Sequence, residues 1–154
     1  LWLVGVTLNT PINVLYSIIE DKLAKGHSIN VLLVHPVPEI VQYAELRAYA
    51  GRSPERTCDL IKDNLRSFAD LKKISPNNMI IKTIHFPLGN GIVGIDPETI
   101  NGVLYVSNYP FRTKGGSLPK FILNREDGKW YTLFKDELLN LWDQGKEWNP
   151  AKSI

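Results

Sequence analysis

The sequence has few of the residues from which covalent and metal sites are built. Among 154 residues there is one cysteine, Cys58, which excludes a disulfide within the chain and argues against a thiolate metal site. The three histidines, His27, His35 and His85, do not have the spacing of a zinc motif. We therefore expect no metal and no cofactor, and the composition favours a reducing, cytoplasmic compartment.

Long apolar runs and familiar enzyme signatures are also missing. No segment reaches the ~20 apolar residues of a membrane span, so we expect no membrane insertion by this segment. The sequence contains no Gly-x-x-x-x-Gly-Lys-Ser/Thr loop for nucleotide phosphates, no Gly-x-Ser-x-Gly and no His-Glu-x-x-His. The formal net charge of +2 is too small to indicate bulk nucleic-acid binding.

The composition is that of one folded domain. Hydrophobic residues make up 44% of the chain and charged residues 22%, which is enough to form a core at this length. We expect one domain over residues 1–148 and a tail over 149–154. The chain starts at Leu1, inside a predicted strand and without an initiator methionine, so we expect an upstream region of the same protein.

Apolar and amphipathic segments alternate along the chain. Continuous apolar runs predict buried strands, and apolar residues at helical spacing predict helices between them. Asn9 or Thr10 is the expected cap of the first helix, with Pro11 at its first position. The pattern predicts an α/β fold, with a mixed, mostly parallel sheet and helices on both faces. The expected strands are 2–8, 29–34, 79–86, 91–95, 103–108 and 121–123. The expected helices run from residue 9 or 10 to Gly26, from about Glu39 to Ala50, from Ser53 to near Ile74, and over 133–142.

Two histidines directly follow predicted strands. His35 follows the strand 29–34, and His85 lies at the end of the strand 79–86. Ligands of open α/β sheets bind beyond the carboxyl ends of the strands, so both imidazoles could face one crevice. There they could act as nucleophile and general acid, or bind an anion. They could equally be unrelated polar residues at the surface.

A basic cluster surrounds the break between the second and third predicted helices. Arg47, Arg52 and Arg56 lie around Gly51, and the hydroxyls of Ser53 and Thr57 lie at the start of the third helix. Free amides and the helix dipole favour an anion at such a start, and arginine can bind phosphate through two hydrogen bonds. The alternative is that the arginines are solvated and pair with carboxylates nearby, namely Glu45, Glu55 and Asp59.

Further candidates lie in the last third of the chain. The loop 112–119 contains Lys114 and paired glycines and ends before Lys120, so it could close over an anionic ligand or be a plain hairpin loop. Tyr105 and Tyr109 flank the presumed site and could stack on a base, although packing in the core is the other reading. Asn108 lies between the two tyrosines in the sequence, at the end of a predicted strand.

The segment Gly91-Ile92-Val93-Gly94-Ile95-Asp96-Pro97, followed by Leu104-Tyr105-Val106-Ser107-Asn108-Tyr109, resembles the centre of a phospholipase D-like domain. The strand 29–34 and the closing helix fit the same superfamily. The chain is most similar to an uncharacterised bacterial single-lobe subgroup, which shares the arginine-rich stretch around Arg47 and Arg52. The family's catalytic motif is His-x-Lys, four residues, then Asp. Asp96 aligns with its aspartate, but Gly89 stands at the histidine and Gly91 at the lysine.

The resemblance implies a phosphate pocket without its nucleophile. The later family motif Gly-Ser-x-Asn survives here in part, as Ser107-Asn108. We therefore predict a catalytically degenerate phospholipase D-like domain that binds a phosphate-bearing ligand, such as a nucleotide, as a sensor or regulatory module. Single-lobe family members often pair, so the resemblance also implies a homodimer. Two alternatives stay open: an active phosphodiesterase or nuclease using His35 or His85, and an interaction module with no small ligand.

Overall fold

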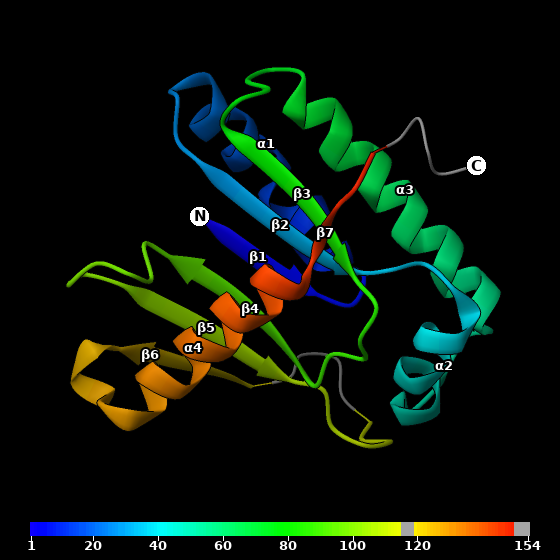
Figure 1. The fold of residues 1–154 in the computed structure, drawn as a ribbon. Helices are drawn as coiled ribbons and strands as arrows, with labels where there is room; N and C mark the ends of the chain where they lie inside the picture. The colour runs from blue at the N-terminus through cyan, green and yellow to red at the C-terminus, as the bar shows by residue number, and fades with distance from the viewer. Residues whose placement is uncertain (115–118, 150–154) are drawn as a thin grey trace.

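The structure, a computed structural model, describes residues 1–114 and 119–149 (Figure 1). The predictions for residues 115–118 and for the end of the tail, 150–154, fall outside that range. In chain order the elements are β1 (Trp2–Gly5), α1 (Asn9–Ala24), β2 (Ile29–Val34), α2 (Pro38–Arg47), α3 (Pro54–Lys72), β3 (Met79–Ile84), β4 (Asn90–Ile95), β5 (Val103–Asn108), β6 (Lys120–Asn124), the 3-10 turn η1 (Arg125–Asp127), α4 (Lys129–Gln144) and β7 (Lys146–Glu147).

The described strands form one mixed sheet in the order β6-β5-β4-β1-β2-β3-β7. Only the pairs β1–β2 and β2–β3 are parallel, whereas β1–β4, β4–β5, β5–β6 and β3–β7 are antiparallel. The prediction of a mostly parallel sheet is therefore wrong. The reason is the connection after β3, which crosses beyond the ends of β2 and β1 and brings β4 back on the far side of β1. Two antiparallel connections then add β5 and β6.

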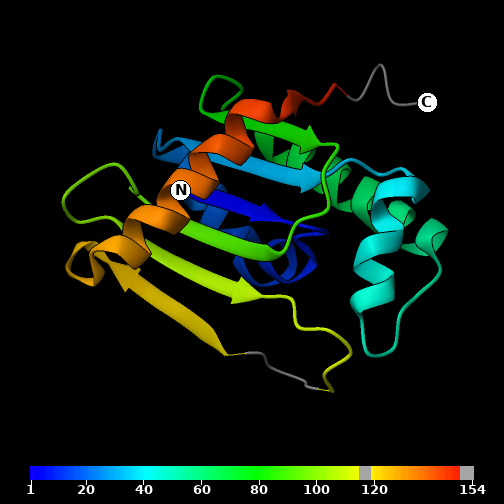
Figure 2. The same cartoon turned by 60° about the horizontal axis from the view of Figure 1, so that its bottom comes forward.

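Helices cover both faces of the sheet, as the sequence predicted. α1 and α3 contact one another on one face, behind the parallel strands, and α4 crosses the other face (Figures 1 and 2). The core between these layers is aliphatic, with Leu3, Val31 and Leu33 of the central strands fully buried. On the α4 side, Leu104 and Leu138 both approach Gly94. None of the helices in the described part of the chain has both the length and the apolar character that crossing a bilayer requires.

The loop between β1 and α1 differs from its prediction. β1 ends at Gly5, and the helix begins at Asn9 after Leu8, whose φ of 51° is left-handed. Neither Asn9 nor Thr10 caps the helix through its side chain, so that prediction is wrong. Instead the Asn9 amide donates to the Thr7 hydroxyl at 3.3 Å. The Nδ2 of Asn64, on α3, donates to the Thr7 carbonyl at 2.8 Å and holds this loop against the helix layer.

Candidate functional site at the carboxyl edge of the sheet

One edge of the sheet gathers most of the predicted site. The strands β1, β2, β3 and β5 all end there, and β4 and β6 begin there, because the last two run antiparallel to their neighbours. The loops that follow these ends carry Thr7, His35, His85 and Tyr109. α2 and the start of α3 lie beyond the same edge (Figure 2). This is the place where open α/β sheets bind ligands.

A pocket of about 610 Å³ opens at this edge, between the end of β1, the C-terminal end of α2 and the segment after β5. Its size lies within the usual range for small-molecule sites, roughly 300–1,000 Å³. The walls are largely apolar, and the polar side chains are few: Thr7, Arg47, Thr113 and Lys114. The lining residues are Val6, Thr7, Ala44, Arg47, Ala48, Tyr49, Ala50, Tyr109, Pro110, Thr113 and Lys114.

Arg47 is the central charge of the pocket. It is the last residue of α2 and is half-buried. Its Nη2 donates to the Leu88 carbonyl at 2.7 Å, and its guanidinium carbon lies 5.2 Å from the centre of the Tyr109 ring. Burial lowers the pKa of Arg47 from its usual value, but a guanidinium stays charged in proteins. Within residues 1–114 and 119–149, no carboxylate forms an ion pair with it.

The hydroxyl of Tyr109 fills the space above two glycines. A Cβ on Gly91 would lie 2.6 Å from that oxygen, and a Cβ on Gly5 would lie 3.1 Å from it. Burial raises the pKa of Tyr109, while a hydrogen bond with the Val6 backbone and the charge of Arg47 act in the opposite direction. Gly91 is the position that the resemblance aligns with the family's lysine. In this chain a tyrosine hydroxyl occupies the space beside it.

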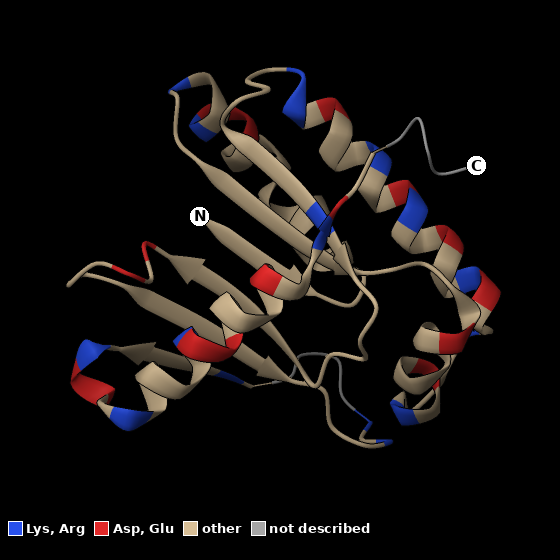
Figure 3. Ribbon diagram, in the orientation of Figure 1, with Lys and Arg blue, Asp and Glu red and all other residues tan. Residues whose placement is uncertain are grey.

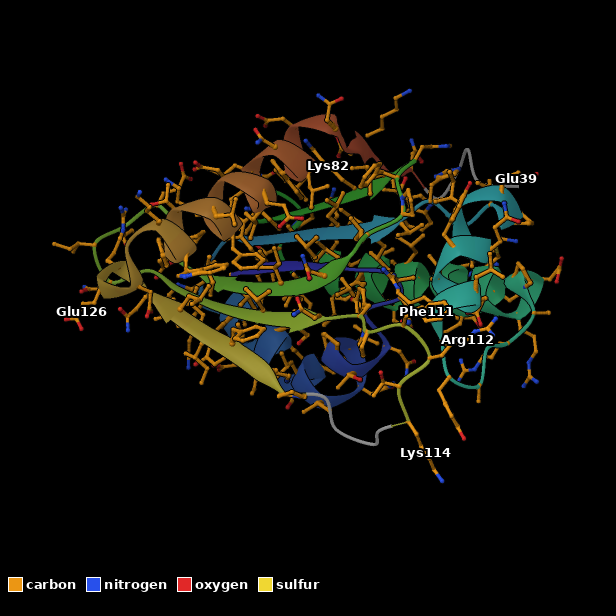
Figure 4. All side chains as sticks on the ribbon, turned by 90° about the horizontal axis from the view of Figure 1, so that it is seen from below. Glu39, Lys82, Phe111, Arg112, Lys114 and Glu126 are labelled. Carbon is orange, nitrogen blue, oxygen red and sulfur yellow. The ribbon has the colours of Figure 1, made fainter. Side chains whose placement is uncertain are left out.

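The segment after β5 is tied to the end of α2. The backbone amide of Arg112 donates to the Arg47 carbonyl at 2.6 Å, and its Nε donates to the Leu46 carbonyl at 3.3 Å. These bonds satisfy carbonyls at the helix end, where α2 stops three residues before the predicted Ala50. Basic residues therefore occur both at the end of α2 and in the segment after β5, the two segments that line the pocket (Figure 3). Lys114 extends outward from the loop, so it belongs to the rim of the pocket (Figure 4).

The predicted anion site at the start of α3 contains a carboxylate of the protein itself. Glu45 accepts a hydrogen bond from the backbone amide of Arg52 and another from the Thr57 hydroxyl at 2.5 Å. Ser53 caps the helix by accepting from the Arg56 amide at 3.4 Å. The amides of Arg52 and Arg56 and the hydroxyl of Thr57 thus have partners within the chain. Ligand binding by these four predicted residues remains a prediction.

The side chains of Arg52 and Arg56 are exposed near this helix start. Arg52 borders a second hollow of about 500 Å³, which Glu45, Tyr49 and Arg112 also line. Glu45 lines this hollow too, so its negative charge offsets part of the positive charge that Arg52 and Arg112 bring to it. The first pocket, around Arg47, has no such carboxylate among its lining residues.

His35 and His85 lie side by side, as their places after β2 and β3 suggested. Their ring centroids are 4.0 Å apart and their planes differ by 21°, and His35 Nδ1 is 3.0 Å from the Thr83 hydroxyl. Burial lowers the pKa of His35, and the charges of His85 and Lys146 lower it further. Face-to-face contact leaves no space for a phosphorus atom between the rings. Neither histidine lines the pocket at Arg47.

The other predicted ligand contacts are dispersed. Tyr105 lies within β5, between Val93 on β4 and Ile122 on β6. Asn108 and Lys120 are exposed at the carboxyl edge, and none of these three predicted residues lines the pocket. Sequence reasoning missed Thr7 and Tyr49 as pocket residues. Thr7 was assigned to a strand that ends two residues earlier, and Tyr49 to a helix that ends at Arg47.

Asp96 lies at the opposite end of β4 from the pocket. It follows Ile95, and its charge acts on the amino group of Leu1, at the start of the chain. Gly91 pairs with Ser107 across the β4–β5 ladder, so these two motif positions do share the carboxyl edge. The aligned aspartate is therefore separated from them by the length of a strand, and from His35 and His85 as well.

The comparisons add no relative from which function could be inferred. No family model, no curated protein and no solved structure matches this chain. The resemblance to the phospholipase D-like superfamily accordingly stays a prediction. Among the described residues, no three His, Cys, Asp or Glu side chains come together in a group that could hold a metal ion.

Proposed function

We propose that this domain binds a small phosphate-bearing molecule, such as a nucleotide, in the pocket at Arg47, and that it does so without cleaving it. The observation that carries the proposal is the half-buried guanidinium of Arg47, which has no ion-pair partner among the described residues. A charge withdrawn from water is costly unless an opposite charge or further hydrogen bonds compensate it. The Leu88 carbonyl uses one of the five guanidinium donors, which leaves others for phosphate oxygens.

The surroundings of Arg47 fit this ligand class. Thr7 and Thr113 add hydroxyl groups to the wall, and Lys114 adds a second positive charge at the rim. The apolar remainder, which includes the ring of Tyr49, suits the non-phosphate part of the ligand. A mononucleotide contains both kinds of surface, whereas inorganic phosphate uses only the polar part.

The origin of the pocket walls supports a sensor or regulatory role. One wall is the end of α2, and the facing wall is the segment after β5, which Arg112 bonds to that helix end. A ligand that contacts Arg47 and Thr113 would bridge the same two segments. Binding would therefore favour one relative position of α2 and the loop, and an upstream region of the protein could read that position.

The active phosphodiesterase is supported less well. Its two histidines are in contact with one another and lie outside the pocket, and the aligned Asp96 is at the other end of β4. A nucleophile and a general acid have to reach the phosphorus and the leaving oxygen on different sides, which stacked rings do not permit. On our proposal, His85→Ala leaves ligand binding unchanged.

Thermal-shift measurements and calorimetric titration with inorganic phosphate, pyrophosphate and ATP test the proposal. Arg47→Gln should weaken binding roughly 10- to 100-fold, because a charge-assisted contact contributes about 1.5–3 kcal/mol. Arg56→Gln is the matched control, since it removes the same charge from the exposed start of α3. Equal losses of affinity in both variants would indicate that only the net charge matters. A loss of affinity in Arg56→Gln alone would place the site at the start of α3. No shift with any of the three probes would contradict the proposal.

A further inference from the structure

The edge strand β6 is unprotected in a way that the opposite edge is not. Within the described chain β6 pairs only with β5, and its side chains Phe121 and Ile122 are 54% and 62% exposed. It carries one charge, Lys120, and no proline. The other edge, β7, is only two residues long and consists of Lys146 and Glu147, a common protection against pairing. An apolar edge of five residues is a template for another strand.

We propose that β6 pairs with β6 of a second copy of this chain, antiparallel, around a two-fold axis at Ile122. The strand reads Lys-Phe-Ile-Leu-Asn, so its pattern of polar and apolar residues is the same from either end. Around that axis Ile122 meets Ile122 of the second copy, Phe121 meets Leu123, and Lys120 meets Asn124. No like charges are opposed, and both apolar pairs are of the kind that stabilises sheets. This self-complementarity favours a second copy over an unrelated strand.

The backbone groups agree with this register. In an antiparallel ladder, alternate residues turn their amide and carbonyl groups toward one neighbour, and the residues between turn theirs toward the other. A two-fold axis at Ile122 pairs even-numbered residues with even-numbered ones and odd with odd. The amide and carbonyl groups that β6 turns away from β5 therefore meet the corresponding groups of the second copy. This holds whether those groups belong to the even-numbered or to the odd-numbered residues.

The apolar surface continues from the strand onto α4. Phe121 and Leu123 pair with Val106 and Leu104 of β5, so they stand on the sheet face that α4 covers. α4 contacts β6 and has a large exposed apolar residue near its start, Trp130, at 65% exposure. A stable interface buries about 800 Å² on each partner, more than five residues of strand supply alone. The flank of α4 offers the additional area.

The pairing does not complete the pocket at Arg47. Because the two β6 strands run in opposite directions, the carboxyl edges of the two sheets point to opposite ends of the dimer. Each pocket then consists of residues from one chain only. Dimerisation and ligand binding are thus separable, which distinguishes this inference from a dimer whose partner supplies part of the site.

Sedimentation velocity and light scattering on the purified chain test the pairing. Wild type should form a dimer, and Ile122→Lys should be monomeric at the same concentration, because two lysines would then face one another at the axis. Ile74→Lys is the control, since Ile74 is exposed at the end of α3, away from β6. The circular dichroism spectra of the two variants should match, which shows that Ile122→Lys still folds, whereas only the unfolding midpoint of the dimeric Ile74→Lys should rise with protein concentration. A monomeric wild type, or a dimer that survives Ile122→Lys, would overturn the proposal.

Cysteine cross-linking in a Cys58→Ala background tests the register. Opposed residues of an antiparallel pair have Cα atoms about 4.5–5.5 Å apart, which suits a disulfide. Ile122→Cys should therefore cross-link to itself on mild oxidation. Phe121→Cys should not, but a mixture of Phe121→Cys and Leu123→Cys chains should. Efficient self-linking of Phe121→Cys would show a different axis and would refute the register.

Discussion

The hydroxyl of Tyr109 lies where the side chain of residue 91 would begin. A Cβ on Gly91 would come within 2.6 Å of that oxygen. The two residues belong to neighbouring parts of the β4–β5 hairpin, and Tyr109 follows β5 directly. The Tyr109 hydroxyl occupies the space that a side chain at position 91 would need, which explains the glycine at the start of β4 opposite the tyrosine that follows β5. This fit also holds the Tyr109 ring beneath Arg47.

We expect Gly91→Ala to destabilise the domain by about 1–3 kcal/mol, because the added methyl group overpacks against Tyr109. Combining it with Tyr109→Phe should recover part of that loss, since the phenylalanine lacks the oxygen. Gly89→Ala serves as the control, as a Cβ there has no atom within 4 Å. Urea unfolding of wild type, Gly91→Ala, Tyr109→Phe and the double variant, analysed as a double-mutant cycle, measures the coupling. Additive effects of the Gly91 and Tyr109 substitutions would contradict the contact.

Glu45 should matter for stability more than an exposed glutamate does. It accepts bonds from the Arg52 amide and from the Thr57 hydroxyl, and Thr57 is buried. Glu45→Ala leaves both donors without this partner, so we expect a cost of about 1–3 kcal/mol. Glu20→Ala, on the exposed face of α1, should change the unfolding free energy little. Comparable effects of the two substitutions would mean that the Glu45 bonds do not persist in solution.

The stability of the domain should depend on pH through His35. Its pKa is lowered in the folded state, so the unfolded chain binds the proton more tightly. Stability should therefore fall as the pH drops through 6.5, the usual histidine value, and level off below the pKa of the folded state. His35→Gln should flatten this decline, whereas the exposed His27→Gln should not. Unfolding midpoints between about pH 7.5 and 4.5 check this expectation.

The parallel half of the sheet was predictable from sequence, and the antiparallel half was not. β2 and β3 are mostly apolar, interrupted only by Asn30 in β2 and by Lys82 and Thr83 in β3, and such segments indicate strands in the interior of a sheet. The strands β4 and β5 were also placed correctly by residue. Their direction depends on how the loop after β3 crosses the sheet, and no local pattern encodes that path. The assumption of a mostly parallel sheet failed there.

Part of the candidate site was likewise predictable from the sequence, and part of it was not. The contact of His35 with His85 follows from two parallel strands ending side by side, so it could be expected. The pocket at Arg47 depends on the bonds between Arg112 and the end of α2, and Arg47 and Arg112 are 65 positions apart in the sequence. The charge cluster around Gly51 includes Arg47, which lines the pocket. Which arginine is buried, and which carboxylate occupies the helix start, depended on packing.

Glu45 and Arg47 stand two residues apart on α2 and turn to different hollows. Glu45 lines the one bordered by Arg52, and Arg47 lines the one bordered by Tyr109. The two hollows share Ala48 and Tyr49 as a common wall. Arg52 and Arg112 also line the hollow of Glu45, so that hollow contains charges of both signs, whereas the pocket at Arg47 is lined by positive charges alone. A ligand that spanned this wall would therefore place its acidic end toward Tyr109, on the side where no carboxylate opposes it.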